Sequence, residues 1–537
     1  MVLRSCVIVM VLLSLVKGET GETEICDQNA NELTDRNDDL ALFEKNEIPG
    51  NEFFQESIRH IHDRYKFEVK KDTDGDNMKT ERFEEFNSWL MKNGAKYPDL
   101  YMKRYTSDVR GVHAKNEISP YMCIVEIPFK CLITDHMGRT ETEIGRKLFS
   151  STTRLSSPSI IAVVIYILTT LEDPVHFFQP YYRILPREYK NFPVFWNEEQ
   201  LSWLQGSPIL HDIEIRKRNM RDDYEEICRV CPEFKMFSYN EFLKIRTAVG
   251  SRNFGVMIQG NKRTAMVPFA DMLNHYRPRE TSWEFKDTKD AFTITSLSPL
   301  LPHQQVMDSY GKKSNTNLFL FYGFALESNR EQDGQCQNDV TIQFHLDKNG
   351  VRGKSALIAQ QFQTKITMNF EDRSTMEALS YCRVAASTDE EIHKLISKME
   401  LDNSRPRGSP SIRNGVVSFI SIANEIKALE MMAAYCEEQL LNYPDTYEEN
   451  TALLQSVSPF TERRSALLIV LSEQEICRFW IQARDKVVAL LKLPQGEIEK
   501  PILLRDFPNR DPADADLARY TVSLAHEIRL HQLSFVN

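Results

Sequence analysis

The sequence lacks the features that mark several common protein classes. Its 537 residues contain no Asn-x-Ser/Thr acceptor for glycosylation, and its 10 cysteines are too far apart for a dense disulfide framework. Lys and Arg number 66 against 77 Asp and Glu, and the net charge of −11 argues against a broad nucleic-acid-binding surface. The apolar runs are too short for a membrane-spanning helix, and no repeat of fixed period occurs. We therefore expect a globular protein that binds no nucleic acid.

Patterns that would assign a hydrolase or a metalloenzyme are also missing. There is no Gly-x-Ser-x-Gly motif, and no group of histidine, cysteine or carboxylate residues has the short spacing of metal ligands. The pair "CRVC" at residues 228 to 231 has no second pair nearby, and we interpret it as part of a surface turn or helix. No metal site is expected.

The N-terminus differs in character from the rest of the chain. Residues 1–18, "MVLRSCVIVMVLLSLVKG", combine Arg4 with an apolar core and a small residue at the end, which predicts a secretory signal peptide with no stable membrane span. Residues 19–80 are acidic and polar, and we expect a partly disordered extension. The compartment stays open, because the widely spaced cysteines that follow are typical of an intracellular enzyme.

From residue 81 onward the pattern predicts an α+β fold. An amphipathic helix at "ERFEEFNSWLMKNG" precedes strands at "VRGVHAKNEI" and "YMCIVEIPFKCLIT", and strand patterns resume at "RTAMVPFADML", "AFTITSLSPL" and "QQVMDSYG". Between them, the apolar run from Ile160 to Leu168 predicts a buried helix, and "QPYYRILPREYKNFPVFW" predicts a surface segment. Long helices dominate after about residue 350; in "SIANEIKALEMMAAYCEEQLLNY" apolar residues recur at steps of four and three, as in a core-facing stripe.

The stretch "MVPFADMLNHYRP", residues 266–278, presents Asp271, Asn274 and His275 after a short apolar run. Alone, an Asn-His pair after a strand is most often a turn with satisfied side chains. However, "SRNFG" precedes it at 251–255, and "DSYGKKSNTNLFLFYGFALESN" follows at 308–329. In order and spacing these blocks resemble the SET-domain methyltransferases, in the branch typified by the Rubisco large-subunit lysine methyltransferase, which includes the actin-histidine methyltransferase. The resemblance spans roughly residues 81 to 480.

This resemblance implies a domain order, a cofactor and a set of site residues. A SET domain would occupy residues 81–335 with a helical insertion at about 135–250, and a helical substrate-binding domain would occupy residues 336–537. The methyl donor would be S-adenosyl-L-methionine, with Arg252 as the partner of its carboxylate. The implied cofactor-binding residues are Gly111, Arg252, Asp271, Asn274, His275 and Tyr310. The implied catalytic residues are Tyr310 and Tyr322, and the implied substrate channel is lined by Phe254 and Tyr322.

Methyl transfer makes demands that aromatic side chains can meet. A protonated lysine has no lone pair, and its amine titrates at about 10.4 in water, so a desolvated channel must lower that pKa. Aromatic walls exclude water and attract the sulfonium and the methylated product. Phe254 and Tyr322 resemble the lysine-modifying branch, since the actin-histidine enzyme has Asn at the first position and lacks the tyrosine. We expect a lysine of a non-histone protein as acceptor, with histidine as an alternative.

Two departures from the family pattern keep a second class of function open. The usual Gly-x-Gly at the start of the domain is here Val109 and Gly111, and valine disfavours the positive φ that glycine permits. "PHQQV" stands where the family has a Gly-Glu turn before the "SYG" strand. A catalytically silent SET fold that binds a protein is the competing hypothesis. In both cases the expected partner is a protein, and the chain is expected to be a monomer.

Overall fold

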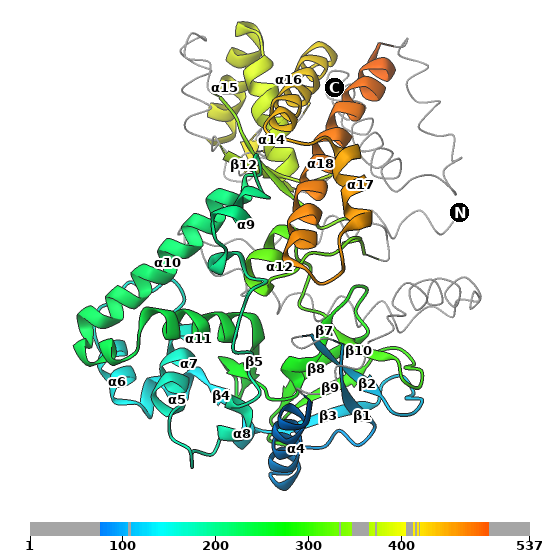
Figure 1. Ribbon diagram of the computed structural model, residues 1–537. Coiled ribbons are helices and arrows are strands. Elements are labelled where there is room, and N and C mark those ends of the chain that lie inside the picture. Colours follow the sequence, from blue (N-terminus) through cyan, green and yellow to red (C-terminus); the bar gives the residue numbers. More distant parts are fainter. Residues whose placement is uncertain are drawn as a thin grey trace.

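The computed structural model describes residues 76–105, 109–331, 335–345, 365–370, 373–403, 412–413, 416–417 and 419–492. The predicted signal peptide and nearly all of the acidic extension lie outside these residues. Figure 1 shows a lower part built of short strands and helices and an upper part built of long helices, with α9, α10 and α12 near their junction. No helix among the described residues is long and apolar enough to cross a membrane.

Three small sheets form the strand-rich part. The first has the order β1 (Leu100–Arg104), β2 (Arg110–Ala114), β10 (Gln305–Asp308) and β7 (Asn274–His275). The second has the order β3 (Cys123–Pro128), β9 (Ala291–Ser296) and β8 (Thr281–Lys286), and the third has β4 (Ile133–Thr134), β6 (Asn261–Met266) and β5 (Asn253–Ile258). In the first sheet β7 runs parallel to β10, with Asn274 opposite Met307 and His275 opposite Asp308. This pairing places the Asn-His pair beside the strand that leads to Tyr310.

Two helices match the sequence pattern closely. The first, α4 (Asp76–Lys92), begins before residue 81, and the chain leaves it through Gly94 at a φ of +93°, a left-handed conformation that glycine adopts at little cost. The second, α7 (Pro158–Thr170), buries every residue from Ile161 to Leu168, so the prediction of a buried core helix is confirmed. Its apolar side chains belong to the same core as those of β4 and β6.

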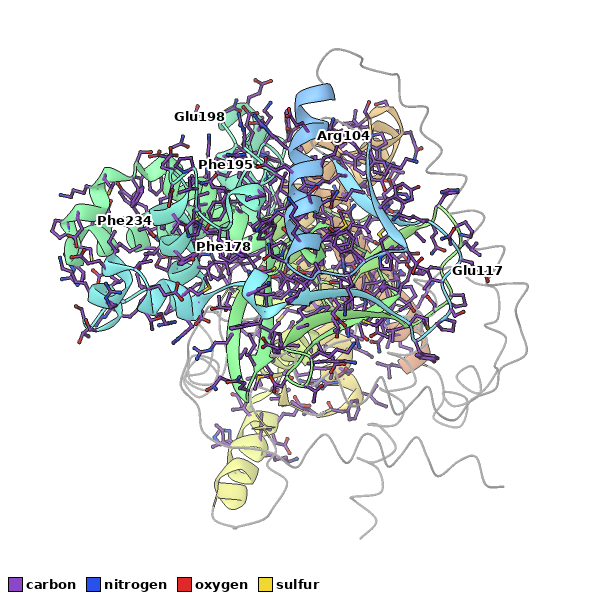
Figure 2. All side chains as sticks on the ribbon, turned by 90° about the horizontal axis from the view of Figure 1, so that it is seen from below. Arg104, Glu117, Phe178, Phe195, Glu198 and Phe234 are labelled. Carbon is purple, nitrogen blue, oxygen red and sulfur yellow. The ribbon has the colours of Figure 1, made fainter. Side chains whose placement is uncertain are left out.

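Helices fill the chain between β4 and β5. They are α5 (Asp135–Thr140), α6 (Glu143–Phe149), α7, α8 (Gln179–Tyr182), α9 (Glu198–Ser202), α10 (Ile209–Val230) and α11 (Tyr239–Arg252), with short 3-10 turns at η3 (Pro193–Phe195) and η4 (Pro232–Met236). Figure 2 shows this insertion, marked by Phe234, at one side of the molecule, and the loop marked by Glu117 at the opposite side. α11 ends at Arg252, so the insertion leads directly into the predicted site.

Two sequence-based expectations for this insertion were wrong. The segment 179–196 is not a surface segment, because Tyr181, Tyr189 and Trp196 are buried; its prolines shape turns that fold the aromatic rings inward. The "CRVC" stretch does lie at the end of a helix, α10, but Cys228 and Cys231 are buried there rather than at the surface. No group of three metal-ligating side chains was found in the described part of the chain.

The upper part contains α14 (Arg373–Ala386), α15 (Asp389–Asn403), α16 (Ile422–Leu441), α17 (Tyr447–Ser456) and α18 (Glu462–Leu491). Two hairpins accompany them, β11 (Val340–Gln343) with β12 (Lys365–Met368), and β13 (Ile412–Arg413) with β14 (Val416–Val417). The apolar stripe of α16 is buried at Leu429, Ala433 and Cys436. Its buried face also carries Glu425, whose carboxylate is 2.7 Å from the Arg383 guanidinium.

An apolar cluster joins the two parts around α12 (Asn315–Tyr322). Its buried members are Trp196, Leu204, Ile209 and Ile213 from the insertion, Phe319 and Leu320 from α12, and Tyr443, Ala466, Ile469 and Val470 from the C-terminal helices. We call this cluster the joint. Because α12 ends at Tyr322, the packing of the joint determines where that predicted channel residue lies.

Candidate active site

Asn274 is held by two hydrogen bonds at the edge of the first sheet. Its side-chain nitrogen donates to the backbone oxygen of Arg110 at 2.8 Å and to Gln305 Oε1 at 2.7 Å. Both amide protons are therefore used within the protein. Gly111 lies against the same Gln305 side chain, because a Cβ on this glycine would be 2.3 Å from Gln305 Oε1. Any cofactor contact at Asn274 would thus use its side-chain Oδ1 or its backbone groups.

A strained backbone position lies next to the site. Phe269 has φ +76° and ψ −48° and stands directly before η5 (Ala270–Met272), which carries Asp271. Its ring stacks on Tyr97 at 3.8 Å, which holds the backbone in this conformation. The hypothesis that Val109 alters the cofactor loop stays a prediction.

Asp271 lies between a guanidinium and a phenol. Arg252 Nη1 is 3.0 Å from the backbone oxygen of Asp271 and 3.3 Å from its Oδ2, and the Tyr181 hydroxyl donates to the same Oδ2 at 2.9 Å. Arg110 lies close enough to this group to interact with Arg252. Burial, followed by the positive charge of Arg252, lowers the pKa of Arg110 to about 10. Two guanidiniums and one carboxylate carry a net charge of +1.

Several buried polar atoms of this group have no hydrogen-bond partner in the described structure. They are Arg252 Nε, Asp271 Oδ1 and Arg110 Nη2. Buried donors without a partner are costly, and they are typical of a site that is completed by a ligand. The two free guanidinium nitrogens and the positive balance fit a carboxylate, such as that of an amino-acid moiety.

An aromatic cluster surrounds His275 of β7 and Tyr310. The His275 ring stacks on Tyr310 at 5.0 Å, Tyr310 lies 4.9 Å from Tyr322, and Phe324 lies 6.2 to 6.4 Å from all three rings. The Tyr310 hydroxyl donates to the backbone oxygen of Leu273 at 2.9 Å. Since its only proton is used there, its oxygen is left as an acceptor. Burial raises the pKa of Tyr310, so this phenol stays protonated.

His275 is neutral in this arrangement. The backbone N–H of Tyr310 donates to His275 Nδ1 at 3.0 Å, which places the ring proton on Nε2. Burial, followed by the charges of Arg277 and Lys313, lowers the pKa of His275 to about 3. The imidazole therefore serves as a fixed ring that supports the backbone of Tyr310.

Phe254 packs against a different group of aromatic rings. Its buried ring meets Trp283 at 5.3 Å and Phe292 at 5.1 Å in edge-on geometry. Alternate residues of β5 are buried, and Phe254 is on the buried face. It packs in the core of the sheets that carry the site, and its role in a channel stays a prediction.

Three side chains of the site were missed by the sequence reasoning. Arg110 could have been predicted, because it stands between Val109 and Gly111, in the stretch where the family pattern has its glycines. Gln305 was treated as a departure from the family, although it accepts a hydrogen bond from Asn274. Tyr181 contacts Asp271 across 90 residues of sequence, and no local pattern reveals such a contact.

Comparisons with known proteins bear on the fold of this chain. A family model described as Rubisco LSMT substrate-binding matches residues 345–476. The structure described as the SET domain of LSMT bound to lysine and AdoHcy is 17% identical, has a TM-score of 0.60, and covers 80% of this chain and 97% of that chain. This chain has the SET fold of the Rubisco LSMT branch. The α+β fold class and the resemblance seen in the sequence are thus confirmed.

Other similar proteins match this SET-fold chain over a similar share of its length. Rubisco LSMT bound to AdoMet has a TM-score of 0.58 at 18% identity, and the match covers 80% of this chain and 97% of that one. The actin-histidine N-methyltransferase of Papio anubis is 22% identical over 79% of this chain and 73% of its own length. That of Homo sapiens is 22% identical over 75% of this chain and 68% of its own length.

Proposed function

We propose that this protein is an S-adenosylmethionine-dependent protein methyltransferase whose acceptor is a lysine side chain of a non-histone protein. The reaction class is supported by the methyltransferase relatives and by the fold shared with structures that bind AdoMet or AdoHcy. The lysine acceptor is supported by the cluster of Tyr310, Tyr322 and Phe324, which presents aromatic faces and one phenolic acceptor.

The residues around Asp271 fit the carboxylate of the methyl donor. Arg252 and Arg110 would grip its oxygens through nitrogens that lack a partner within the protein. Asp271 and Tyr181 orient Arg252 for this task. When bound, S-adenosylmethionine supplies an electrophilic methyl group. Gly111, through backbone atoms, and Asn274, through Oδ1 or backbone atoms, would line its binding surface.

The aromatic cluster would orient the acceptor amine. The Tyr310 oxygen can accept a hydrogen bond from an incoming N–H, because its own proton is held by Leu273. The rings of Tyr322 and Phe324 exclude water and so favour the neutral amine over the ammonium. This constellation holds the lone pair of the amine in one direction, which lowers the entropic part of the barrier.

Histidine is the second candidate acceptor, supported by the names of the curated relatives. The experiment uses the full chain, S-adenosylmethionine with a tritiated methyl group, and two peptide libraries that contain either lysine or histidine. Hydrolysis and amino-acid analysis should recover labelled methyllysine. Labelled methylhistidine alone would refute the lysine proposal.

A cofactor-binding experiment distinguishes a methyltransferase from a catalytically silent SET fold. Calorimetry should detect S-adenosylmethionine binding that Arg252→Ala weakens by at least tenfold. Arg218→Ala, which removes an exposed arginine of α10, should bind as the wild type does. A folded wild-type protein that binds no cofactor at millimolar concentration would favour the protein-binding module.

A further inference from the structure

Arg277 connects the segment after the Asn-His pair to the residue before Tyr310. Its Nη1 donates to the Ser309 hydroxyl at 2.9 Å. Its Nε donates to Glu331 Oε1 at 2.8 Å, and its Nη2 donates to Glu331 Oε2 at 2.6 Å. The Arg277 and Glu331 side chains are only 9% and 10% exposed. Because the two parallel bonds to one carboxylate fix the plane of the guanidinium, they also fix the direction of Nη1.

The Ser309 hydroxyl holds the backbone on both sides of Tyr310. It accepts a hydrogen bond from Arg277, and it accepts a second one from the backbone N–H of Gly311 at 3.3 Å. Gly311 has a φ of +96°, which glycine adopts at little cost. The backbone N–H of Tyr310 itself donates to His275 Nδ1 at 3.0 Å. The place of Tyr310 therefore depends on the Ser309 hydroxyl as well as on His275.

Glu331, which holds Arg277, is anchored in turn. Its backbone N–H donates to the backbone oxygen of Gln335 at 2.8 Å. Two residues earlier, the buried Asn329 donates from Nδ2 to the backbone oxygen of Lys313 at 2.7 Å. Lys313 lies in the loop that leads from Tyr310 to α12. The Glu331 carboxylate thus offers Arg277 an acceptor whose own segment is tied to the same loop.

The influence of Arg277 on Tyr310 is geometric rather than electrostatic. Arg277 and Glu331 form an ion pair whose charges balance. After burial, the pKa of the Tyr310 phenol responds to other charges, those of Arg252, Asp308 and Asp271. Arg277 therefore acts on Tyr310 through the hydrogen bond to Ser309.

We propose that Arg277, held by Glu331, is a positioning residue that keeps Tyr310 in place to orient the acceptor amine. This inference rests on the proposed lysine methyltransferase function. A displacement of about 1 Å can cost about a hundredfold in the rate of a reaction that depends on orientation. Arg252 and Arg110, which would hold the cofactor carboxylate, take no part in these hydrogen bonds. Loss of the contact should therefore lower kcat and leave cofactor affinity unchanged.

The test measures apparent kcat and KM of the full chain on an equimolar library of peptides with one lysine each, labelled from tritiated S-adenosylmethionine. Ser309→Ala removes the bridging hydroxyl and should lower kcat about ten- to a hundredfold. KM for the library, and the Kd for S-adenosylmethionine by calorimetry, should change by less than about twofold. Such a split between kcat and KM is not expected from a loss of folded protein.

A double variant tests the ion pair without leaving a buried charge uncompensated. Arg277→Met combined with Glu331→Met removes both charges, which a buried site tolerates better than the loss of one. It should lower kcat by about the same factor as Ser309→Ala. The triple variant should be no slower than either, because both changes break one connection. Ser296→Ala is the matched control, since Ser296 is a buried serine that donates to the backbone oxygen of Ser119 at 2.9 Å, and it should keep the wild-type kcat.

Other outcomes overturn the inference in distinguishable ways. A wild-type kcat in Ser309→Ala, or losses that multiply in the triple variant, would refute a path from Arg277 through Ser309 while the lysine methyltransferase function stands. Weaker S-adenosylmethionine binding with an unchanged kcat would assign these residues to cofactor binding instead. A wild type that binds S-adenosylmethionine but labels no lysine would refute the proposed function as well. If the double variant melts early, Ser309→Ala decides alone.

Discussion

The carboxyl of Glu473 is buried in the joint, and its ionisation should determine how stability depends on pH. Glu473 is 2% exposed on α18 and accepts hydrogen bonds from Ser207 at 2.8 Å and from Tyr443 at 2.9 Å. Burial is the main cause that raises its pKa to about 8, and the charges of Asp339 and Asp212 act in the same direction. The two hydroxyls oppose the shift but do not cancel it. Asp212 is on α10, so the groups that disfavour a charged Glu473 come from both sides of the joint.

The sign and size of the effect follow from proton linkage. Between pH 4.5 and about 8 the folded protein keeps a proton on Glu473 that the unfolded chain has lost, so stability falls as the pH rises. The slope is about 1.4 kcal/mol per pH unit, which amounts to about 5 kcal/mol over the whole window. Below pH 4.5 both states hold the proton and Glu473 contributes no pH dependence.

Glu473→Gln isolates this contribution, because glutamine has the shape of the protonated acid and stays neutral. Urea unfolding at pH 5 should give similar free energies for the variant and the wild type. At pH 8 the variant should be more stable by several kcal/mol. Glu475→Gln, which changes a more exposed carboxylate two residues away beside Arg330, is the matched control and should follow the wild-type curve. Parallel curves for Glu473→Gln and the wild type from pH 5 to 9 would refute the assignment of a protonated Glu473.

Two further substitutions test the site and the helical part. Gly111→Ala should weaken S-adenosylmethionine binding at least tenfold by calorimetry, because its Cβ would displace Gln305; Gly255→Ala, whose Cβ meets nothing within 4 Å, should bind normally. Glu425→Gln should lower the free energy of unfolding by about 3 to 5 kcal/mol, because it removes the negative charge that pairs with the fully buried Arg383 guanidinium. Glu390→Gln changes an exposed ion pair and should leave the free energy of unfolding at the wild-type value. An equal loss of stability in both variants would contradict this account.

Much of the fold was readable from local sequence patterns. The strands at the site and the buried α7 follow from apolar periodicity, because each of these elements faces one core. The prediction of a surface segment at 179–196 was wrong for a physical reason. Proline and charged residues suggested a surface, yet Tyr181 and Trp196 turn inward and use their polar atoms on Asp271 and on the backbone of Lys190. Burial of such residues depends on distant partners that a local pattern does not contain.

One departure from the family pattern, the "PHQQV" stretch, packs directly against the glycine that the chain has kept. Gln305 comes from the "PHQQV" stretch and lies over Gly111, where only a glycine leaves room for its side chain. The same amide oxygen accepts the Asn274 proton, so Gln305 links β2, β7 and β10. The glycine that matters here is therefore the one that the chain has kept, since it is required by side-chain packing rather than by backbone conformation.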